Sequence, residues 1–349
     1  MPLKVNLKLE NFVGKGNGVY SAYLTELTSL ERYGDVILNR CTDEECNVIH
    51  YHSLGFGYAR SSIAHRTKIV ITAHVVPDSF NGSLIFSRYW HKSAREYLRW
   101  AYQQAQIVIA VSPQVENDLR ELGITRQIKV LPNSVDHTVF KFDPASRRRY
   151  RQLWGFHPQD FIILGVGQIQ PRKGITDFVE TARRLPEYHF VWAGGRPYGK
   201  LTADFYSLNL IIENAPANVH FIGQMEIKEM PGLYAAADVY FLPSYHENFA
   251  LATIEAASVG LPLVLRDLNA YRNSLHDCYL AGSNAGDFTK LLMKLRDKRF
   301  FEQWQASSKT LAFRYGIESH CRELYRIYEE IAVRNRTGAR PRRKWVSAV

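Results

Sequence analysis

The chain has 349 residues, of which 46% are hydrophobic, and a formal net charge of +10. This length exceeds the usual size of one hydrophobic core, so we expect two domains. No apolar run reaches the roughly 18 residues that cross a bilayer, and residues 4–9 have the pattern of a strand rather than of a signal peptide. These features argue against an integral membrane or secreted protein and favour one that stays in the cytoplasm.

The excess of basic residues favours an anionic partner, but nucleic acid, a membrane surface and an anionic substrate would all satisfy it. The four cysteines show no close pair with matching histidines of the kind that holds a metal. They are Cys41, Cys46, Cys278 and Cys321. We interpret them as reduced and structural, and we expect neither a metal nor another cofactor.

Short apolar strands alternate with helical stretches along the chain, which predicts parallel sheets with helices on both faces. The strands of a first series are expected at residues 5–9, 35–38, 47–52, 68–74, 107–112 and 128–132. Those of a second series are expected at residues 161–167, 189–195, 219–223, 239–244 and 262–267. Two such series predict an α/β protein with two Rossmann-like, doubly wound domains.

The junction between the two series is expected near residues 140–155, a polar and basic passage. We therefore divide the chain into domains at residues 1–145 and 146–315. A helix at about 316–334 is expected to lead the chain back across the first domain, and residues 335–349 form a basic tail.

Ligand sites in such folds lie beyond the carboxyl ends of the strands, so the residues after each strand are the first candidates. Gly16 and Gly18 lie in the loop after the first strand, where glycines permit close approach of a ligand. A dinucleotide fingerprint would require glycine at the position of Val19, so an NAD site is not indicated. A plain tight turn is the alternative for these glycines.

His74 ends the expected strand at 68–74, at the place where a site would lie. Its imidazole could donate a hydrogen bond to a hydroxyl group or help to stabilise developing charge. The alternative is a structural histidine, which is the commoner role for a lone one.

Residues 84–104 interleave basic and aromatic side chains, including Trp90 and Trp100. The basic residues recur at steps of four and three, which places them on one helical face; they are Arg88, Lys92, Arg95 and Arg99. An interfacial helix needs this combination, because aromatic rings settle at headgroup depth while cations meet anionic lipid. The alternatives are a charged surface helix packed by its aromatics and, on charge alone, a nucleic-acid surface.

Arg172 and Lys173 follow the first strand of the second series, between Gly167 and Gly174. Their fixed positive charge suits a diphosphate, at about 1.5–3 kcal/mol for each charge-assisted contact. A solvated charge pair is the alternative.

Glu247 and Glu255 are eight residues apart in the segment after the expected strand at 239–244. On a helix this spacing is roughly 12 Å of rise and about 80° of rotation, so both carboxylates could face one cleft. The helix would begin near Asn248 to Ala250, where unpaired backbone N–H groups favour a phosphate. Hydroxyl-binding carboxylates around a phosphate site suit a nucleotide-sugar. The alternative is an amphipathic helix with two solvated glutamates.

The spacing Glu247-x7-Glu255, preceded by Phe-Leu-Pro-Ser and followed by Ala-Ala-Ser-Val-Gly-Leu-Pro, resembles the E-x7-E motif of retaining GT-B-fold glycosyltransferases, the glycosyl transferases group 1. The resemblance extends over nearly the whole chain. Through residues 166–195 it is nearest to bacterial glucosyl-diacylglycerol glucosyltransferases. It implies two Rossmann-like domains that face each other across a cleft.

The resemblance also implies roles for single residues. The group next to the reacting sugar would be His74, Glu247 and Lys173. The donor would be held by Gly16, Gly18, Arg172, Lys173, Asn248, Phe249, Ala250 and Glu255, with Glu255 on the ribose. The chain departs from the family pattern at Val75, Gln168 and Ala250, where the family has Asp, Arg and Gly.

We therefore expect a retaining hexosyltransferase that moves glucose from UDP-glucose to a lipid or glycolipid acceptor. It would lie peripherally on the inner face of the cell membrane, with Arg88, Trp90, Lys92, Arg95, Arg99 and Trp100 toward anionic lipid and acceptor. The alternatives are an acceptor in surface polysaccharide or lipid-linked oligosaccharide assembly, and a non-catalytic binding module of the same fold. A nucleic-acid partner is not expected, because it would not account for the nucleotide-sugar motifs.

Overall fold

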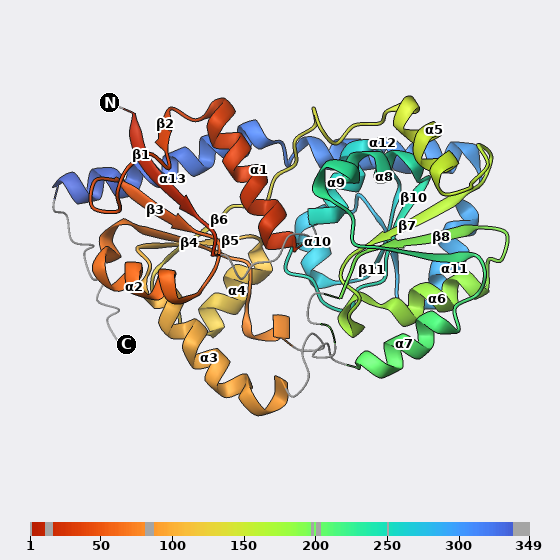
Figure 1. Ribbon diagram of the computed structural model, residues 1–349, viewed down its shortest axis with the longest axis horizontal. Coiled ribbons are helices and arrows are strands. Elements are labelled where there is room, and N and C mark those ends of the chain that lie inside the picture. Colours follow the sequence, from red (N-terminus) through yellow and green to blue (C-terminus); the bar gives the residue numbers. More distant parts are fainter. Residues whose placement is uncertain are drawn as a thin grey trace, which may run out of the picture.

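The structure is a computed structural model that describes residues 2–10, 17–80, 87–196, 199, 204–249 and 251–337, with the side chains of residues 80, 87–91 and 337 left aside. Two α/β domains lie side by side, each built on one parallel sheet (Figure 1). The expected α/β class with two doubly wound domains is confirmed. Gly16, Ala250 and the tail beyond residue 337 lie outside the described residues.

The N-terminal sheet has the strand order β2-β1-β3-β4-β5-β6. Its strands are β1 (Leu3–Lys8), β2 (Val36–Leu38), β3 (Val48–Tyr51), β4 (Ile69–Ala73), β5 (Ile107–Ala110) and β6 (Gln127–Val130). Its helices are α1 (Gly18–Tyr33), α2 (Phe56–Ala64), α3 (Ser87–Gln104) and α4 (Pro113–Glu121), with short 3-10 turns at Arg66–Lys68 and Pro77–Phe80. The order reverses beside β1, so β1 and β3 end at the point where ligands bind in such sheets.

The C-terminal sheet has the order β12-β11-β10-β7-β8-β9. Its strands are β7 (Ile162–Val166), β8 (His189–Ala193), β9 (Val219–Gly223), β10 (Val239–Leu242), β11 (Leu263–Arg266) and β12 (Leu280–Gly282). Its helices are α5 (Pro144–Leu153), α6 (Ile175–Arg183), α7 (Phe205–Glu213), α8 (Met230–Ala236), α9 (Leu251–Val259), α10 (Asn269–Leu275), α11 (Ala285–Lys294) and α12 (Lys298–Phe313), with 3-10 turns at Pro171–Lys173 and Ile227–Glu229. β12 was not expected from the sequence.

Helices cover both faces of each sheet, which is why the strands are nearly continuous apolar runs rather than alternating ones. In β4, Ile69, Val70 and Ile71 are all completely buried. In the C-terminal domain, the ring of Phe178 on α6 packs edge-on against Trp192 of β8, with ring centroids 4.9 Å apart. These cores fix the carboxyl ends of the strands, and therefore the loops that form the site.

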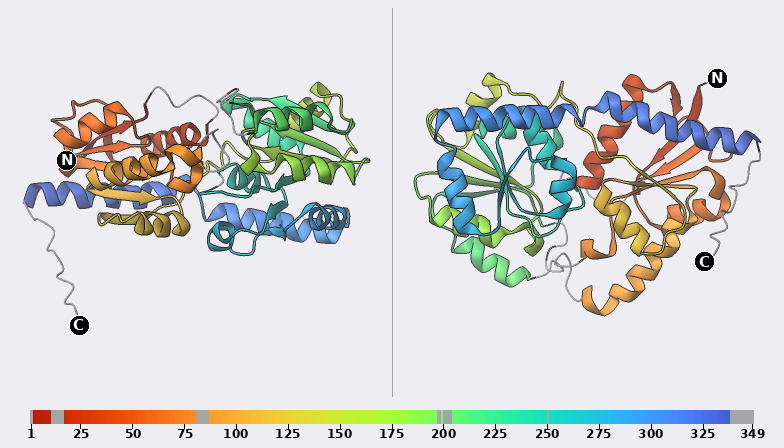
Figure 2. Two further views of the ribbon diagram at one scale, coloured as in Figure 1. Left: turned by 90° about the horizontal axis from the view of Figure 1, so that it is seen from below. Right: turned by 180° about the vertical axis from the view of Figure 1, so that it is seen from behind.

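The last helix, α13 (Ile317–Thr337), leaves the C-terminal domain and packs on the N-terminal one, where it contacts α1, β1 and β3. Figure 2 shows this crossing from behind, with α12 and α13 running along the edge of both domains. Leu324, Tyr328 and Ile331 of α13 are completely buried in the N-terminal core. The backbone at Val135 pairs with that at Gly316, so the two crossings between domains lie together.

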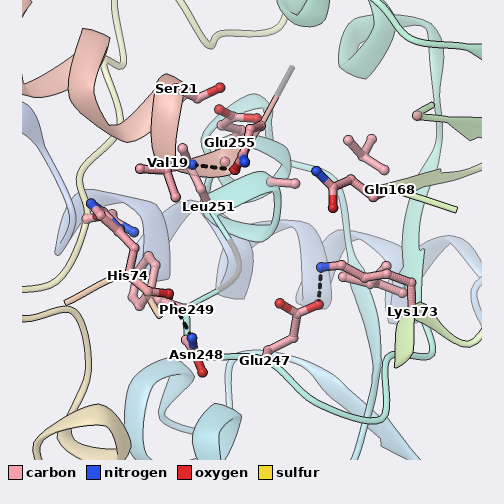
Figure 3. A pocket seen from close by; sticks show the side chains of 18 of the residues that line it. Val19, Ser21, His74, Gln168, Lys173, Glu247, Asn248, Phe249, Leu251 and Glu255 are labelled. Carbon is pink, nitrogen blue, oxygen red and sulfur yellow. Dashed lines mark hydrogen bonds and ion pairs between the residues drawn. The ribbon is translucent and has the colours of Figure 1, made fainter. Parts of the chain in front are cut away.

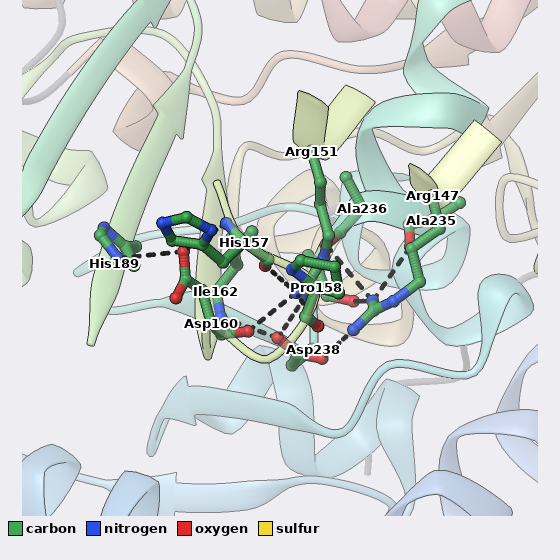
Figure 4. A network of polar contacts seen from close by, with 11 residues as sticks. Arg147, Arg151, His157, Pro158, Asp160, Ile162, His189, Ala235, Ala236 and Asp238 are labelled. Carbon is green, nitrogen blue, oxygen red and sulfur yellow. Dashed lines mark hydrogen bonds and ion pairs between the residues drawn. The ribbon is translucent and has the colours of Figure 1, made fainter. Parts of the chain in front are cut away.

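A buried arginine ties α5 to the strand ends of the C-terminal domain farthest from the site (Figure 4). Arg151 Nε donates to the carbonyl of Ala236, and its Nη1 donates to those of His157, Pro158 and Asp160. Its Nη2 donates to Asp238 at 2.7 Å. Because each nitrogen of this guanidinium has a partner, the charge is tolerated in a nearly inaccessible position.

Candidate active site

A cavity of about 320 Å³ lies between the carboxyl ends of the strands of the two domains. The N-terminal domain contributes the start of α1 and residues around His74, and the C-terminal domain contributes the loops after β7, β8 and β10. The lining includes the expected residues Gly18, His74, Arg172, Lys173, Glu247, Asn248, Phe249 and Glu255. A cavity of this size between two domains is a typical small-ligand site.

Glu247 lies in the loop between β10 and α9, four residues before the helix begins at Leu251. The expectation that one helix carries both carboxylates is therefore wrong, because the polar segment around Glu247 stays non-helical. The two carboxylates nevertheless line one cavity, at separate positions around it (Figure 3). The loop brings Glu247 there, and the helix brings Glu255.

Glu247 and Lys173 form a buried ion pair at the floor of the site. Lys173 Nζ donates to Glu247 Oε1 at 2.5 Å, and Ser244 Oγ donates to the same oxygen at 2.8 Å. Burial alone would raise the pKa of Glu247, but the cations of Lys173 and Arg172 hold it below its ordinary value. The carboxylate is therefore ionised, and much of the Lys173 charge is already neutralised before a ligand enters.

Arg172 is the second cation of this loop. Its Nε donates to Gln170 Oε1 at 2.9 Å, and its Nη1 donates to the carbonyl of His246 at 3.3 Å. Gln170 in turn donates to Gln168 Oε1 at 3.0 Å, which places the glutamine at 168 on the same cavity wall. The guanidinium is thus oriented by two neutral partners, and its charge also helps to hold the pKa of Glu247 below its ordinary value.

Two glycines let this wall form. Gly174 follows Lys173 with φ of 73°, and a Cβ there would lie 2.2 Å from the carbonyl oxygen of Pro243. At Gly194, after β8, a Cβ would lie 1.8 Å from the carbonyl oxygen of Gly167. By contrast, a Cβ at Gly18 would meet none of the described residues within 4 Å, so packing among those residues does not itself require glycine there.

Glu255 lies on α9, where it is 9% exposed. Tyr234 donates its hydroxyl hydrogen to Glu255 Oε2 at 2.7 Å. Burial without a cationic partner raises the pKa of Glu255 from 4.5 to about 7. The group therefore accepts hydrogen bonds in a dry position, which suits ribose hydroxyls.

Asn248 connects the two domains. Its Nδ2 donates to the carbonyl of His74 at 2.9 Å and to Ser79 Oγ at 2.8 Å (Figure 3). The neighbouring Phe249 packs edge-on against Tyr315. The side chain of Asn248 is therefore engaged across the cleft, and the expected role of its segment at a donor phosphate, through backbone N–H groups, stays a prediction.

His74 directly follows β4 and faces the cavity. Its Nε2 lies 3.0 Å from Nδ1 of His52, which sequence reasoning did not single out. Burial, and then the neighbouring His52, hold the pKa of His74 well below its ordinary value, so the imidazole is neutral. Asn17 was missed as well: its side chain caps α1 at the cavity edge by accepting from the backbone N–H of Val19.

The basic and aromatic residues of α3 lie elsewhere. Lys92, Arg95, Arg99 and Trp100 are exposed, and none of these four lines the cavity. Arg95 donates to the carbonyl of Glu121, and Trp100 packs beside Tyr97. Arg88 and Trp90 also belong to α3, but their side chains lie outside the described part of the chain.

Two parallel-sheet domains that meet at an inter-domain cavity, with cations and a buried carboxylate on the C-terminal wall, define a glycosyltransferase of the GT-B class. Residues 146–292 match the family described as Glycosyl transferases group 1, and residues 21–139 match Glycosyltransferase Family 4. The chain therefore contains a glycosyl transferases group 1 domain, and the two matched regions together support membership of the GT-B glycosyltransferases.

Two curated relatives act on glycolipids by name. The alpha-galactosylglucosyldiacylglycerol synthase of Streptococcus pneumoniae is 29% identical over 343 residues, which span 96% of this chain and 91% of the relative. The processive diacylglycerol alpha-glucosyltransferase of Acholeplasma laidlawii is 26% identical, over 77% of this chain and 84% of the relative. The chain is a glycosyltransferase with relatives of this kind.

Solved structures share the fold. HepE from Anabaena, solved in complex with UDP-glucose, superposes with a TM-score of 0.73 at 14% identity, over 94% of this chain and 100% of that chain. WaaG, a glycosyltransferase involved in lipopolysaccharide biosynthesis, superposes with a TM-score of 0.64 at 17% identity, over 93% and 99% of the two chains. Both cover the two domains together, which confirms the GT-B architecture.

Proposed function

We propose that this glycosyltransferase moves a hexose, glucose in the first instance, from a UDP-linked donor to a lipid or glycolipid acceptor with retention of anomeric configuration. The observation that carries the proposal is the single cavity that joins Glu255 to the Lys173–Glu247 pair and His74. The named substrates of the two curated relatives support the lipid acceptor, and the HepE complex supports UDP-glucose.

In this proposal the donor spans the cavity from Glu255 to Glu247. Ribose hydroxyls donate hydrogen bonds to the buried side chain of Glu255. No cation contributes to the pKa shift of this carboxyl group, so it can serve as their acceptor. The diphosphate lies at Arg172, a cation on the cavity wall, and close to the N-terminus of α9. The hexose then lies between Glu247 and His74, where a carboxylate and an imidazole can bind hydroxyls.

Retention is supported by the roles that the described side chains of the cavity already have, because an inverting mechanism would need one of them as a general base. An inverting enzyme needs a carboxylate or imidazole placed to take the acceptor proton. Of the two carboxylates, Glu247 is held by Lys173 and Ser244, and Glu255 lies apart from that pair (Figure 3). The imidazole of His74 also lines the cavity, and in this proposal it binds a hydroxyl of the donor sugar rather than taking the acceptor proton. Attack on the face of the departing diphosphate, whose oxygens can take the proton themselves, needs no such base.

We also propose that transfer needs no metal, since the cationic side chain of Arg172 and the Lys173–Glu247 pair line the cavity wall where the diphosphate would lie. Activity that persists in excess chelator would agree with this. Activity that returns only on addition of a divalent cation would contradict it.

The acceptor would reach the site from a membrane surface. On the N-terminal domain, Phe56 and Ile63 of α2 are 95% and 71% exposed, and Trp100 is exposed on α3, a helix that contacts α2. Tyr97 joins these helices by donating to the carbonyl of Leu54. Exposed aromatic and aliphatic side chains among cations suit the interface of an anionic bilayer.

Within the described chain, no helix combines the length and the apolar character needed to span a bilayer. We propose a peripheral position on the cytoplasmic face of the cell membrane. The four cysteines are all free, which agrees with a reducing compartment.

The decisive experiment offers nucleotide-hexoses to the full chain with diacylglycerol or glucosyl-diacylglycerol in anionic vesicles. Transfer from UDP-glucose to lipid, with an α-linked product by NMR coupling constants, is expected. A β-linked product would refute retention. Transfer only to a soluble or polysaccharide acceptor would refute the lipid acceptor, and binding without turnover of any donor would indicate a non-catalytic module.

Vesicle sedimentation tests the membrane surface separately. A variant with Lys92, Arg95 and Arg99 changed to Gln should bind anionic vesicles less than wild type at low salt. The matched control changes Lys294, Lys298 and Arg299, exposed on the other domain, and loses the same charge. Equal losses in both variants would show a net-charge effect and contradict an oriented surface.

A further inference from the structure

We propose that Gln170 is a positioning residue that fixes the direction of two side chains on the cavity wall. Gln168 then presents its amide hydrogens, and Arg172 its guanidinium, to phosphate or sugar oxygens of one bound ligand. That this ligand is a nucleotide-sugar rests on the proposed function, whereas the direction of the two side chains follows from the contacts among the three residues.

The three residues stand at alternate positions of the loop after β7. Gln170 has an extended backbone, with φ of −143° and ψ of 150°, so neighbouring side chains alternate between two sides. Ile169 is buried in the C-terminal core. Gln168, Gln170 and Arg172 line the cavity, and Gln170 is only 1% exposed. The side chain of Gln170 is therefore enclosed between those of its two partners.

Arg172 decides the direction of each amide, because a guanidinium nitrogen donates hydrogen bonds and does not accept them. Arg172 Nε lies 2.9 Å from the amide of Gln170, so the atom that faces it is the oxygen. The amide nitrogen of Gln170 points the other way and donates to Gln168 at 3.0 Å. The atom of Gln168 that accepts this hydrogen bond is its oxygen. Since amides do not titrate, no protonation state has to be assumed.

The amide nitrogen of Gln168 is thereby directed into the cavity. Figure 3 shows it on the side that faces Glu255 and Val19. Among the residues that the structure describes, none accepts a hydrogen bond from this nitrogen. Its two hydrogens suit an oxygen of the ligand, whether on a phosphate or on a sugar. Gln168 is therefore a neutral donor on a wall that also carries Arg172 and Lys173.

The contact with Gln170 also orients Arg172. Gln170 Oε1 accepts from Nε of the guanidinium, and the carbonyl of His246 accepts from Nη1 at 3.3 Å. Because the guanidinium is planar, two held nitrogens fix the plane of the whole group. The loss of the Gln170 amide would release one edge of Arg172 and the amide of Gln168 together.

Other contacts hold the backbone of this loop. The N–H of Ile169 donates to the carbonyl of Gly195 at 3.0 Å, and the N–H of Tyr245 donates to the carbonyl of Arg172 at 2.7 Å. Neither contact uses the side chain of Gln170. A substitution at Gln170 therefore tests the direction of the neighbouring side chains rather than the path of the loop.

The first test removes the donor itself, with affinities for UDP-glucose, UDP and uridine measured by calorimetry. Gln168→Met keeps the length of the side chain and lacks the amide. It should weaken UDP-glucose binding roughly tenfold, the value of about one charge-assisted hydrogen bond, and leave uridine binding unchanged. A loss already present with UDP assigns the acceptor to a phosphate, and a loss seen only with UDP-glucose assigns it to the sugar. An equal loss with uridine, or no loss with any ligand, would overturn the role of Gln168.

The second test asks whether Gln170 acts through Gln168. Gln170→Met should weaken UDP-glucose binding at least as much as Gln168→Met, because it releases two side chains. The double variant should lose less than the product of the two single losses, since part of the effect of Gln170 passes through Gln168. Losses that multiply would show independent effects and would overturn the positioning role.

Gln170→Glu supplies a second background with almost unchanged volume. Its carboxylate still accepts from Arg172 but cannot donate to Gln168, so the amide of Gln168 should turn its nitrogen toward the carboxylate and away from the cavity. In this background Gln168→Met should lower UDP-glucose affinity little further. The added charge is common to both proteins and leaves the comparison intact. The same loss from Gln168→Met in both backgrounds would contradict the proposal.

The matched control is Gln127→Met. Gln127, on β6, also bridges an arginine to another side chain, since it accepts from Arg334 Nη2 at 2.7 Å and donates to Glu330 Oε1 at 3.0 Å. It does not line the cavity, so all three affinities should stay as in wild type.

Transfer assays separate this inference from the proposed function. If no nucleotide-hexose is transferred to any acceptor, the proposed function fails, whereas the affinities still decide the roles of Gln168 and Gln170. If transfer occurs and the variants at these two positions bind every ligand as wild type does, the proposed function stands and this inference fails.

Discussion

Replacing Glu255 by Gln should stabilise the protein at alkaline pH while weakening nucleotide binding. The carboxyl group of Glu255 is buried in α9, with Tyr234 as its hydrogen-bond donor. The amide side chain of the variant would keep an oxygen for that donor and would carry no charge. The gain in stability and the loss of nucleotide affinity have one cause, because Glu255 is an ionisable hydrogen-bond acceptor that is buried away from water.

The magnitude follows from the pKa of Glu255, which burial raises from 4.5 in the exposed group to about 7 in the folded protein. Between these values the folded state keeps a proton that the unfolded state has lost, so stability falls as pH rises through this window. About 2.5 pH units at 1.36 kcal/mol each is a penalty of about 3 kcal/mol above pH 7.

Denaturant unfolding at two pH values measures this directly. The variant should exceed wild type by about 1 kcal/mol at pH 5 and by about 3 kcal/mol at pH 8. UDP affinity at pH 8 should fall by about 1–3 kcal/mol, because ribose hydroxyls lose an ionised acceptor. Glu302→Gln, on an exposed part of α12, is the control and should behave alike at both pH values.

A stability difference that does not change between pH 5 and pH 8 would refute the burial argument. Unchanged UDP affinity in a folded variant would instead remove Glu255 from the nucleotide site. The two outcomes are independent, so each part of the reasoning can fail separately.

Three further predictions concern other contacts of the fold and site. Changing Arg172 and Lys173 together to Gln should weaken UDP binding far more than uridine binding, by about 1.5–3 kcal/mol per lost contact, and equal losses measured by calorimetry would contradict a diphosphate role. Asn248→Ala removes two hydrogen bonds between the domains and should widen the cleft, which an unchanged small-angle scattering profile would contradict. Arg151→Lys should lower the free energy of unfolding by about 3–5 kcal/mol, whereas Arg148→Lys, at an exposed position of α5, should change it little.

The strands were predictable because burial on both faces leaves long apolar runs in the sequence, and the two series of strands gave the α/β class correctly. β12 was missed because it has only three residues, one of them exposed. The helix was expected to begin near residues 248–250, and α9 begins at Leu251, but Glu247 was wrongly given a helical position, since the spacing of two glutamates carries no information about where a helix begins. Glu247 lies in the loop before α9, and this loop brings its carboxylate to Lys173.

The residues that line the cavity from the C-terminal domain were largely foreseeable, because they follow strands whose ends meet at one edge. The cluster behind His74 was not. Glu26 lies on an amphipathic helix, His50 and His52 lie at and just after a buried strand, and His320 lies on a helix almost 300 residues from Glu26. Only tertiary packing brings these groups together, so no local pattern could indicate them.

The return of α13 to the N-terminal domain has a consequence for biosynthesis. Leu324, Tyr328 and Ile331 complete the apolar cover of a sheet whose first strand begins at Leu3. A ribosome must therefore translate the whole second domain before the first can close its core, which reverses the usual N-to-C order of domain folding. Until then the early strands are exposed to aggregation, and the site remains unformed in every nascent chain.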